Sequence, residues 1–184
     1  SGYSTATTAK NTGVGVSALQ DNTGIGNTAV GWNASSQNSS GNYNASLGEE
    51  ALEGVDGNAN TGNTAVGFQS NTAVTTGGYN TTVGYQSGVV IAAGDYNICL
   101  GQTAGNNITS GSGNVVIGVA DVASATGDDQ LKISDGEDGS VVWMTGDSSA
   151  NITFAAEVAA ATLDISGAID IDGTANLDTV DIDG

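Results

Sequence analysis

The stretch Asn63-Thr64-Ala65-Val66-Gly67 decides the fold, because the chain contains seven pentapeptides of this pattern. Each copy opens with Asn, carries a mostly small third residue and a branched aliphatic fourth residue, and closes with Gly. The closing glycines recur with a period of about 17 residues, and such a regular period is the signature of a repeat protein. The opening asparagines and closing glycines are Asn11 and Gly15, Asn27 and Gly31, Asn44 and Gly48, Asn63 and Gly67, Asn80 and Gly84, Asn97 and Gly101, and Asn114 and Gly118.

Aligning the copies predicts which side chains share a face. Side chains alternate along a strand, so the second and fourth residues of each pentapeptide lie on one face and the third on the other. The fourth residue is always Val, Leu or Ile, and we expect it to face a core together with the Thr-rich second column. The third column is small and includes Cys99, which we expect to be a packed residue rather than a reactive thiol. We expect the Asn column to form a hydrogen-bonded ladder.

One copy of the repeat buries almost nothing, so the copies must stack. Glycine abundance and short aliphatic clusters favour strands over helices. The predicted fold is therefore all-β, a repeat-built parallel β-roll or β-solenoid. Because the core of one chain would be thin, we expect a homotrimer, in which each chain has two further copies of itself as partners.

Three regions are expected, because the repeat pattern changes twice along the chain. The β-roll of seven repeats covers residues 1–122. A connector, residues 123–161, contains a hairpin around an Asp-Gly turn within 131–144 and another strand at 151–154. Hexads in residues 162–184 predict a slender β-shaft, the start of a longer region.

Charge and composition exclude several classes of function. The 20 acidic residues stand against 2 Lys, with no Arg or His, for a net charge of −18. Phosphate contacts need cations, so we expect no nucleic-acid partner. No apolar run is long enough to span a bilayer, so we expect no membrane insertion. We expect no enzyme, no cofactor and no catalytic residue, although a carboxylate pair suited to glycoside hydrolysis stays open.

Two acidic motifs near the end resemble calcium loops. They are Asp170-Ile171-Asp172-Gly173 and Asp181-Ile182-Asp183-Gly184. The remaining ligand spacing of an EF-hand is missing, so we predict no metal site and interpret these residues as solvated strand faces.

The aromatic and Thr columns raise two further alternatives. Trp32, Phe68 and Tyr85 follow closing glycines, and we expect them to pack over neighbouring repeats or chains rather than stack on sugars. Thr arrays also occur on ice-binding solenoids. We expect this Thr column to be internal, because Ile98 and Val115 share it.

The pentapeptides followed by an aromatic, as in residues 63–68 and 80–85, resemble the repeats of phage tail fibres. They are also similar to the β-roll heads of trimeric autotransporter adhesins. The resemblance covers about residues 9–122 and implies a left-handed parallel β-roll with three chains side by side. It implies a structural segment of a virion tail fibre that is extracellular and supports host attachment, with the receptor bound by a tip outside this segment. The alternative is an adhesin head on a bacterial outer surface that binds surfaces or matrix.

Overall fold

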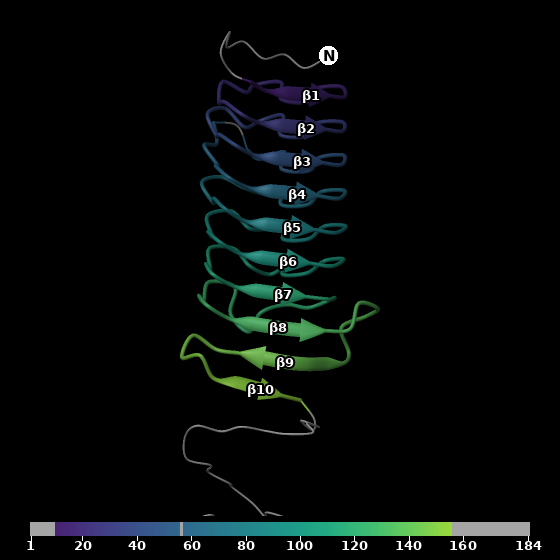
Figure 1. The fold of residues 1–184 in the computed structure, drawn as a ribbon, viewed down its shortest axis with the longest axis vertical. Coiled ribbons are helices and arrows are strands. Elements are labelled where there is room, and N and C mark those ends of the chain that lie inside the picture. The colour runs from purple at the N-terminus through teal and green to yellow at the C-terminus, as the bar shows by residue number, and fades with distance from the viewer. Residues whose placement is uncertain (1–9, 56, 156–184) are drawn as a thin grey trace, which may run out of the picture.

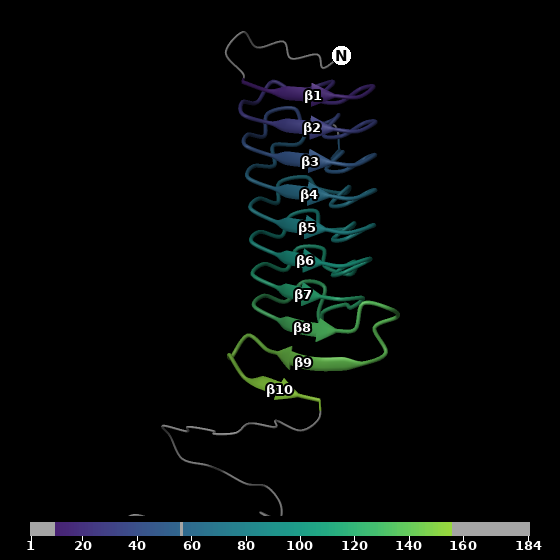
Figure 2. The ribbon, with the colours of Figure 1, turned by 45° about the vertical axis from the view of Figure 1, so that its right-hand side comes forward.

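The computed structural model describes residues 10–55 and 57–155, which form a column of stacked coils (Figure 1). Each coil contributes one short strand, and the strands lie above one another along the column, as the turned view also shows (Figure 2). The hexads predicted to form a shaft, residues 162–184, lie outside the described residues. The all-β solenoid predicted from the repeats is confirmed.

The strands of the seven pentapeptides each cover the second to fourth residues of the repeat. They are β1 (Thr12–Val14), β2 (Thr28–Val30), β3 (Ala45–Leu47), β4 (Thr64–Val66), β5 (Thr81–Val83), β6 (Ile98–Leu100) and β7 (Val115–Ile117). Three further strands follow, β8 (Leu131–Ser134), β9 (Val142–Gly146) and β10 (Ile152–Phe154).

All ten strands belong to one sheet in sequence order. Strands β1 to β8 are parallel, and their register pairs equivalent positions of successive repeats, as in Thr64 with Thr81 and Val66 with Val83. Strand β8 continues this register and also pairs with β9 in an antiparallel sense, which confirms the predicted hairpin. Strand β10 confirms the strand predicted at 151–154 and pairs antiparallel with β9.

The predicted orientation of the strands is wrong. The third column faces inward: Ala29, Ala65 and Cys99 are fully buried. The aliphatic fourth column faces outward, and Val14 is 57% and Leu47 51% exposed. A coil of this short length has a narrow interior, which admits small side chains from the strand and larger ones only from the turns opposite. The Thr column is not internal either, because Thr28 is exposed.

Two sets of side chains fill the interior of the column. After each of the first six closing glycines, the third residue is small and buried, as at Ala18, Ala34, Ala51 and Ala104. Larger side chains reach in from the turns, among them Leu19, Leu52, Val74, Ile91 and Ile108. They form three separate apolar clusters along the axis. The core is therefore narrow and built mostly from contacts between neighbouring coils.

Candidate functional site

A ladder of asparagines runs along the column at the start of each strand. In each step a side-chain oxygen accepts the backbone N–H of the next asparagine, as from Asn80 to Asn63 (2.8 Å) and from Asn97 to Asn80 (2.9 Å). Each amide nitrogen between Asn27 and Asn114 also donates to a backbone carbonyl of the following turn, as Asn80 does to Gly94 (2.8 Å). This is the hydrogen-bonded ladder that the asparagine column predicts.

The ladder has one more member than the pentapeptides indicate. Gln130 precedes β8, and its backbone N–H and side-chain amide both donate to the side-chain oxygen of Asn114, at 2.9 and 3.1 Å. Sequence alignment misses it because Gln replaces Asn and no closing glycine follows β8. Its spacing from Asn114, close to the period of the repeat, is the signal that would have found it.

The closing glycines are required by both conformation and space. Gly67 has φ +126°, and a Cβ there would lie 2.4 Å from the carbonyl oxygen of Gly84 in the next coil. Successive coils therefore approach each other through bare backbone at this point. This close approach is between coils of the same chain.

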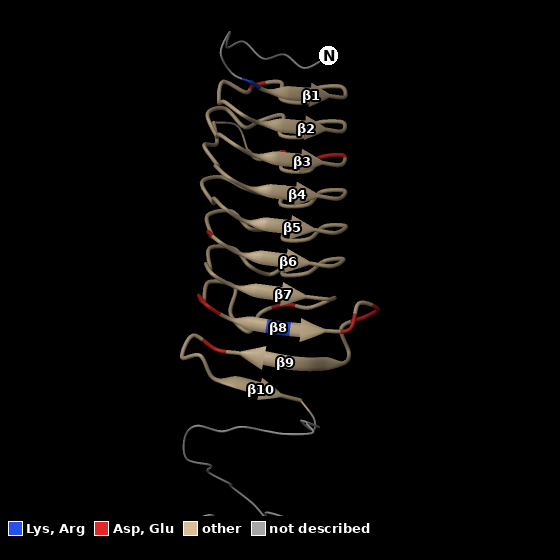
Figure 3. Ribbon diagram, viewed as in Figure 1, with Lys and Arg blue, Asp and Glu red and all other residues tan. Residues whose placement is uncertain are grey.

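The outward face of β1 to β7 is uncharged, with a column of branched aliphatic residues beside a column rich in Thr. None of these seven strands contains an acidic or basic residue, and the acidic residues lie in turns and loops (Figure 3). The second and fourth residues of the strands form this surface, which we call the strand face. Its exposed members include Val14, Leu47, Val83, Ile98 and Ile117.

Aromatic side chains line both edges of the strand face. After the closing glycines, the Phe68 and Tyr85 rings stack with centroids 5.3 Å apart, as expected of packing between neighbouring repeats. Trp32, in the same column, is 47% exposed. A second column precedes the asparagines, where Tyr79 and Tyr96 stack with centroids 5.0 Å apart and planes within 5°. Sequence reasoning missed this second column, because tyrosines and glycines share it.

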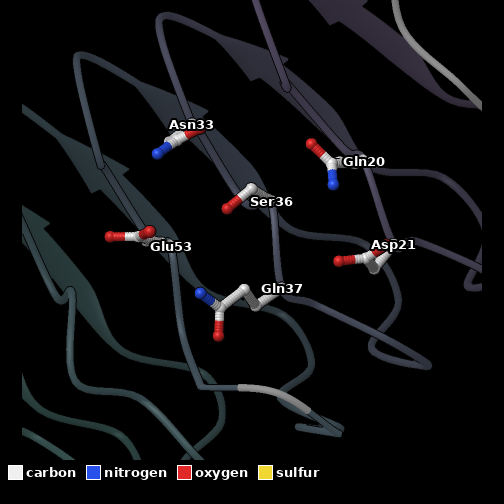
Figure 4. A pocket seen from close by; sticks show the side chains of 6 residues that line it. All are labelled: Gln20, Asp21, Asn33, Ser36, Gln37 and Glu53. Atoms are coloured by element: carbon white, nitrogen blue, oxygen red, sulfur yellow. The ribbon is translucent and has the colours of Figure 1, made fainter.

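A polar groove of about 600 Å³ lies on the turns that follow β1, β2 and β3. Side chains from three successive coils surround the same space (Figure 4). Burial, and then the charge of Glu50, raises the pKa of the Glu53 carboxyl above its ordinary value. The lining residues are Gln20, Asp21, Asn33, Ser36, Gln37 and Glu53.

The two carboxylates of the groove, Asp21 and Glu53, belong to coils two steps apart, so their backbones are separated along the axis by about 9.6 Å. The groove offers hydrogen bonds to a polar molecule.

The Cys99 thiol is buried in the strand interior. Burial, and then the Asp121 carboxylate, raises the pKa of the Cys99 thiol to about 12, so it stays protonated at neutral pH. Residues 10–55 and 57–155 contain no cluster of three or more His, Cys, Asp or Glu suited to a metal ion. Within the same ranges no helix is long and apolar enough to cross a membrane.

No family model, curated protein or solved structure matches this chain. The strand face, its aromatic edges and the polar groove are therefore the surfaces from which a function is inferred. Of these, the strand face is the most extended, since it runs along all seven pentapeptide coils.

Proposed function

We propose that this chain is a structural segment of a homotrimeric fibre of the phage tail-fibre type, which supports host attachment through a tip outside this segment. The observation that carries the proposal is the exposed, uncharged strand face. Branched aliphatic residues repeat there in register, and Val14, Leu47 and Val83 expose 57, 51 and 38% of their surface.

The continuity of the strand face supports a covered surface. Its seven parallel strands give six steps of about 4.8 Å, a length of about 29 Å, and three-residue strands are about 10 Å wide. The projected area, on the order of 300 Å², is in the range of the largest patches that soluble monomers expose. The aromatic edges widen it further. Three copies meeting at an axis would remove this surface from water.

Charge restricts how copies of this chain can meet. Each chain carries 20 acidic residues and 2 Lys, so most pairs of surfaces repel each other. The strand face avoids this repulsion because β1 to β7 contain no charged residue. A trimer built through this face keeps the acidic turns apart and in contact with water.

The experiment is to measure the solution mass of the whole chain by light scattering after size exclusion. We expect three times 18.0 kDa. In a double variant, Val66→Lys with Val83→Lys, two layers of three like charges would meet at the axis, and we expect a monomer with an unchanged far-ultraviolet spectrum. The matched control places Lys at two exposed loop residues, Thr76 and Ser110, and should remain trimeric.

Two outcomes contradict the proposal in different ways. A monomeric unsubstituted chain rules out the trimer itself. A variant with lysines at Val66 and Val83 that still has three times the chain mass shows that another surface joins the copies.

A further inference from the structure

The strand face does not end with the pentapeptides. Strand β8 pairs with β7 in the register of the repeats, and directly paired residues lie on the same face of a sheet, as Ile133 does with Ile117. The antiparallel pairing of β8 with β9, and of β9 with β10, carries this face to the end of the sheet (Figure 2). We call this continuation the hairpin face. It consists of Leu131, Ile133, Met144, Ile152 and Phe154.

The hairpin face is apolar and open to solvent at its last strand. Ile152 is 48% and Phe154 is 47% exposed. The charged residue of β8, Lys132, alternates with the members of the hairpin face and so lies on the opposite side of the sheet, where it lines a pocket with Asp121. The hairpin face is therefore uncharged, as the strand face is, in a chain with a net charge of −18. Another copy of the chain can approach both faces without repulsion between carboxylates on them.

The pentapeptide coils alone do not fix how far one copy is displaced along another. The fourth column is a branched aliphatic residue in every coil, and the coils from β4 to β7 pair in one register. A copy displaced by one coil, about 4.8 Å, therefore meets Val, Leu or Ile again. Such a displacement uncovers only one layer at each end of the interface. A repetitive surface needs a further element that disfavours the displaced registers.

The hairpin face has the features of such an element. Among the strands that the structure describes, none from β1 to β8 contains an aromatic residue, whereas β10 carries Phe154 beside Ile152. Strand β10 is the last of the sheet, so a displacement in either direction leaves the β10 layer of one copy uncovered. Loss of one buried aromatic side chain shifts an equilibrium about tenfold or more. The layer at the other end, Thr12 and Val14, is smaller.

We propose that the hairpin face binds the hairpin faces of the two other copies and thereby aligns the three chains along the fibre axis. This inference rests on the proposed trimer and assigns its register to strands outside the repeats. Threefold symmetry places equivalent residues at one level, so the Phe154 side chains of all three copies meet in a single layer. Staggered copies would leave part of this layer in water. Their interfaces would also stay open to further copies, because they do not close.

The test is fluorine-19 NMR of the whole chain labelled with 5-fluorotryptophan, with the mass of each sample measured by light scattering. The two tryptophans report on both ends of the column, since Trp32 follows β2 and Trp143 lies in β9. Aligned copies are equivalent and give one resonance for each tryptophan, whereas staggered copies are inequivalent and give more. In the unsubstituted trimer we expect staggered species to hold less than about a tenth of the signal, because they uncover the β10 layer.

A double variant and a control assign the alignment to the hairpin face. In Ile152→Ser with Phe154→Ser the β10 layer loses its apolar side chains, and we expect the staggered share of the signal to rise at least about fivefold while the mass stays at three chains. The control is Val141→Ser, which removes an apolar side chain that is 52% exposed and precedes β9, and it should leave one resonance for each tryptophan. Far-ultraviolet spectra check the fold, and if the double variant does not fold, Phe154→Ser decides alone.

The mass separates a failure of this inference from a failure of the trimer. A monomeric unsubstituted chain rejects both. A trimer with extra resonances in the unsubstituted chain, or with none in the double variant, rejects only the alignment by the hairpin face. Extra resonances in Val141→Ser would assign the effect to the β8–β9 turn and also reject it. A monomeric double variant would show that the hairpin holds the copies together rather than aligning them, which contradicts the proposal as well.

Discussion

The first coils and the later coils of the column have the same backbone conformation but different kinds of buried side chain. Seven residues after the closing glycine stands Asn22 or Asn38 in the first two coils, and Ile91 or Ile108 in two later ones. All four side chains are buried. The asparagines are held by hydrogen bonds, as between Asn22 and the carbonyl of Asn38 (3.0 Å), whereas the isoleucines join an apolar cluster with Cys99 and Val116.

This difference shows that the coil geometry is set by the ladder and the glycines rather than by the core residues. The buried asparagines and the buried isoleucines do not stabilise the column equally. Burying an aliphatic side chain contributes about 1.5–3 kcal/mol, whereas a typical internal hydrogen bond contributes only about 1 kcal/mol net. We therefore expect the later coils to be the more stable region, with slower hydrogen exchange of their strand amides.

The largest expected effect is that of Ile91→Ala in the apolar region. Ile91 is fully buried, and removing its side chain leaves a cavity, so we expect a loss of about 2–5 kcal/mol in the free energy of unfolding. Urea unfolding measures this loss, and hydrogen exchange shows whether it falls on the coils around β5 to β7. Val90→Ala, at an exposed neighbour, is the control and should cost less than about 0.5 kcal/mol. Similar losses for both variants would contradict a core at Ile91.

A second substitution tests the ladder that both regions share. In Asn80→Ala the backbone N–H of Asn97 and the carbonyl of Gly94 lose their side-chain partner. Buried groups left without a partner cost about 1–3 kcal/mol, and we expect a loss of about 2–3 kcal/mol in unfolding free energy. Asn27→Ala, in the polar region, should cost a similar amount, because the same bonds are lost.

The control for the ladder is Asn42→Ala. Its side-chain oxygen accepts the exposed backbone N–H of Ile25, and water can replace that bond. A cost at Asn80 no larger than at Asn42 would show that the ladder does not hold the coils together.

A third substitution should stabilise the boundary between the two regions. Both polar atoms of the Asn71 side chain are buried without a partner. Leu19 and Leu52 occupy the equivalent place in other coils, with φ 56 and 53° against 51° at Asn71. Asn71→Leu should therefore raise the unfolding free energy by about 1 kcal/mol, measured by urea unfolding. A loss of stability would mean that this coil lacks the room that its neighbours provide.

The smallest expected effect concerns the hairpin at the end of the solenoid and appears only in acid. The Asp135 carboxylate accepts the backbone N–H groups of Val141, Asp138 and Gly139, which lower its pKa to about 2. Its contribution to stability is present above the ordinary pKa of about 3.9 and is lost as the pH falls toward 2. Asp135→Asn should remove this part of the acid sensitivity in melting temperatures. Carbon-13 NMR should give a titration midpoint near 2 for Asp135, and a midpoint near 3.9 would contradict the loop geometry.

The sequence predicted the strands well but not the direction in which they face. Pentapeptide spacing located β1 to β7 and their register, because each repeat supplies one coil. Alternation along the strands puts Val66 and Val83 on the same face of the sheet. It does not say whether that face points to the core or to the surface. That choice depends on the diameter of the coil, which is narrow enough to accept Ala65 and Thr82 instead.

The candidate site was less accessible to sequence reasoning for a related reason. Tyr79 and Tyr96 belong to different repeats, and their stacking becomes visible only once the column before the asparagines is known to be aligned from coil to coil. Asn71 could not be predicted either, because the repeat pattern does not show that its buried side-chain amide lacks a hydrogen-bond partner.

The constant step of the solenoid also bears on how such a chain can change over generations. From β4 to β7 every coil has the same length and pairs in the same register. Recombination between two coils in this stretch would join matching columns, so an insertion or deletion of one whole coil would keep the asparagines, glycines and outward aliphatics aligned. Length could then be altered in increments of about 4.8 Å without designing a new junction.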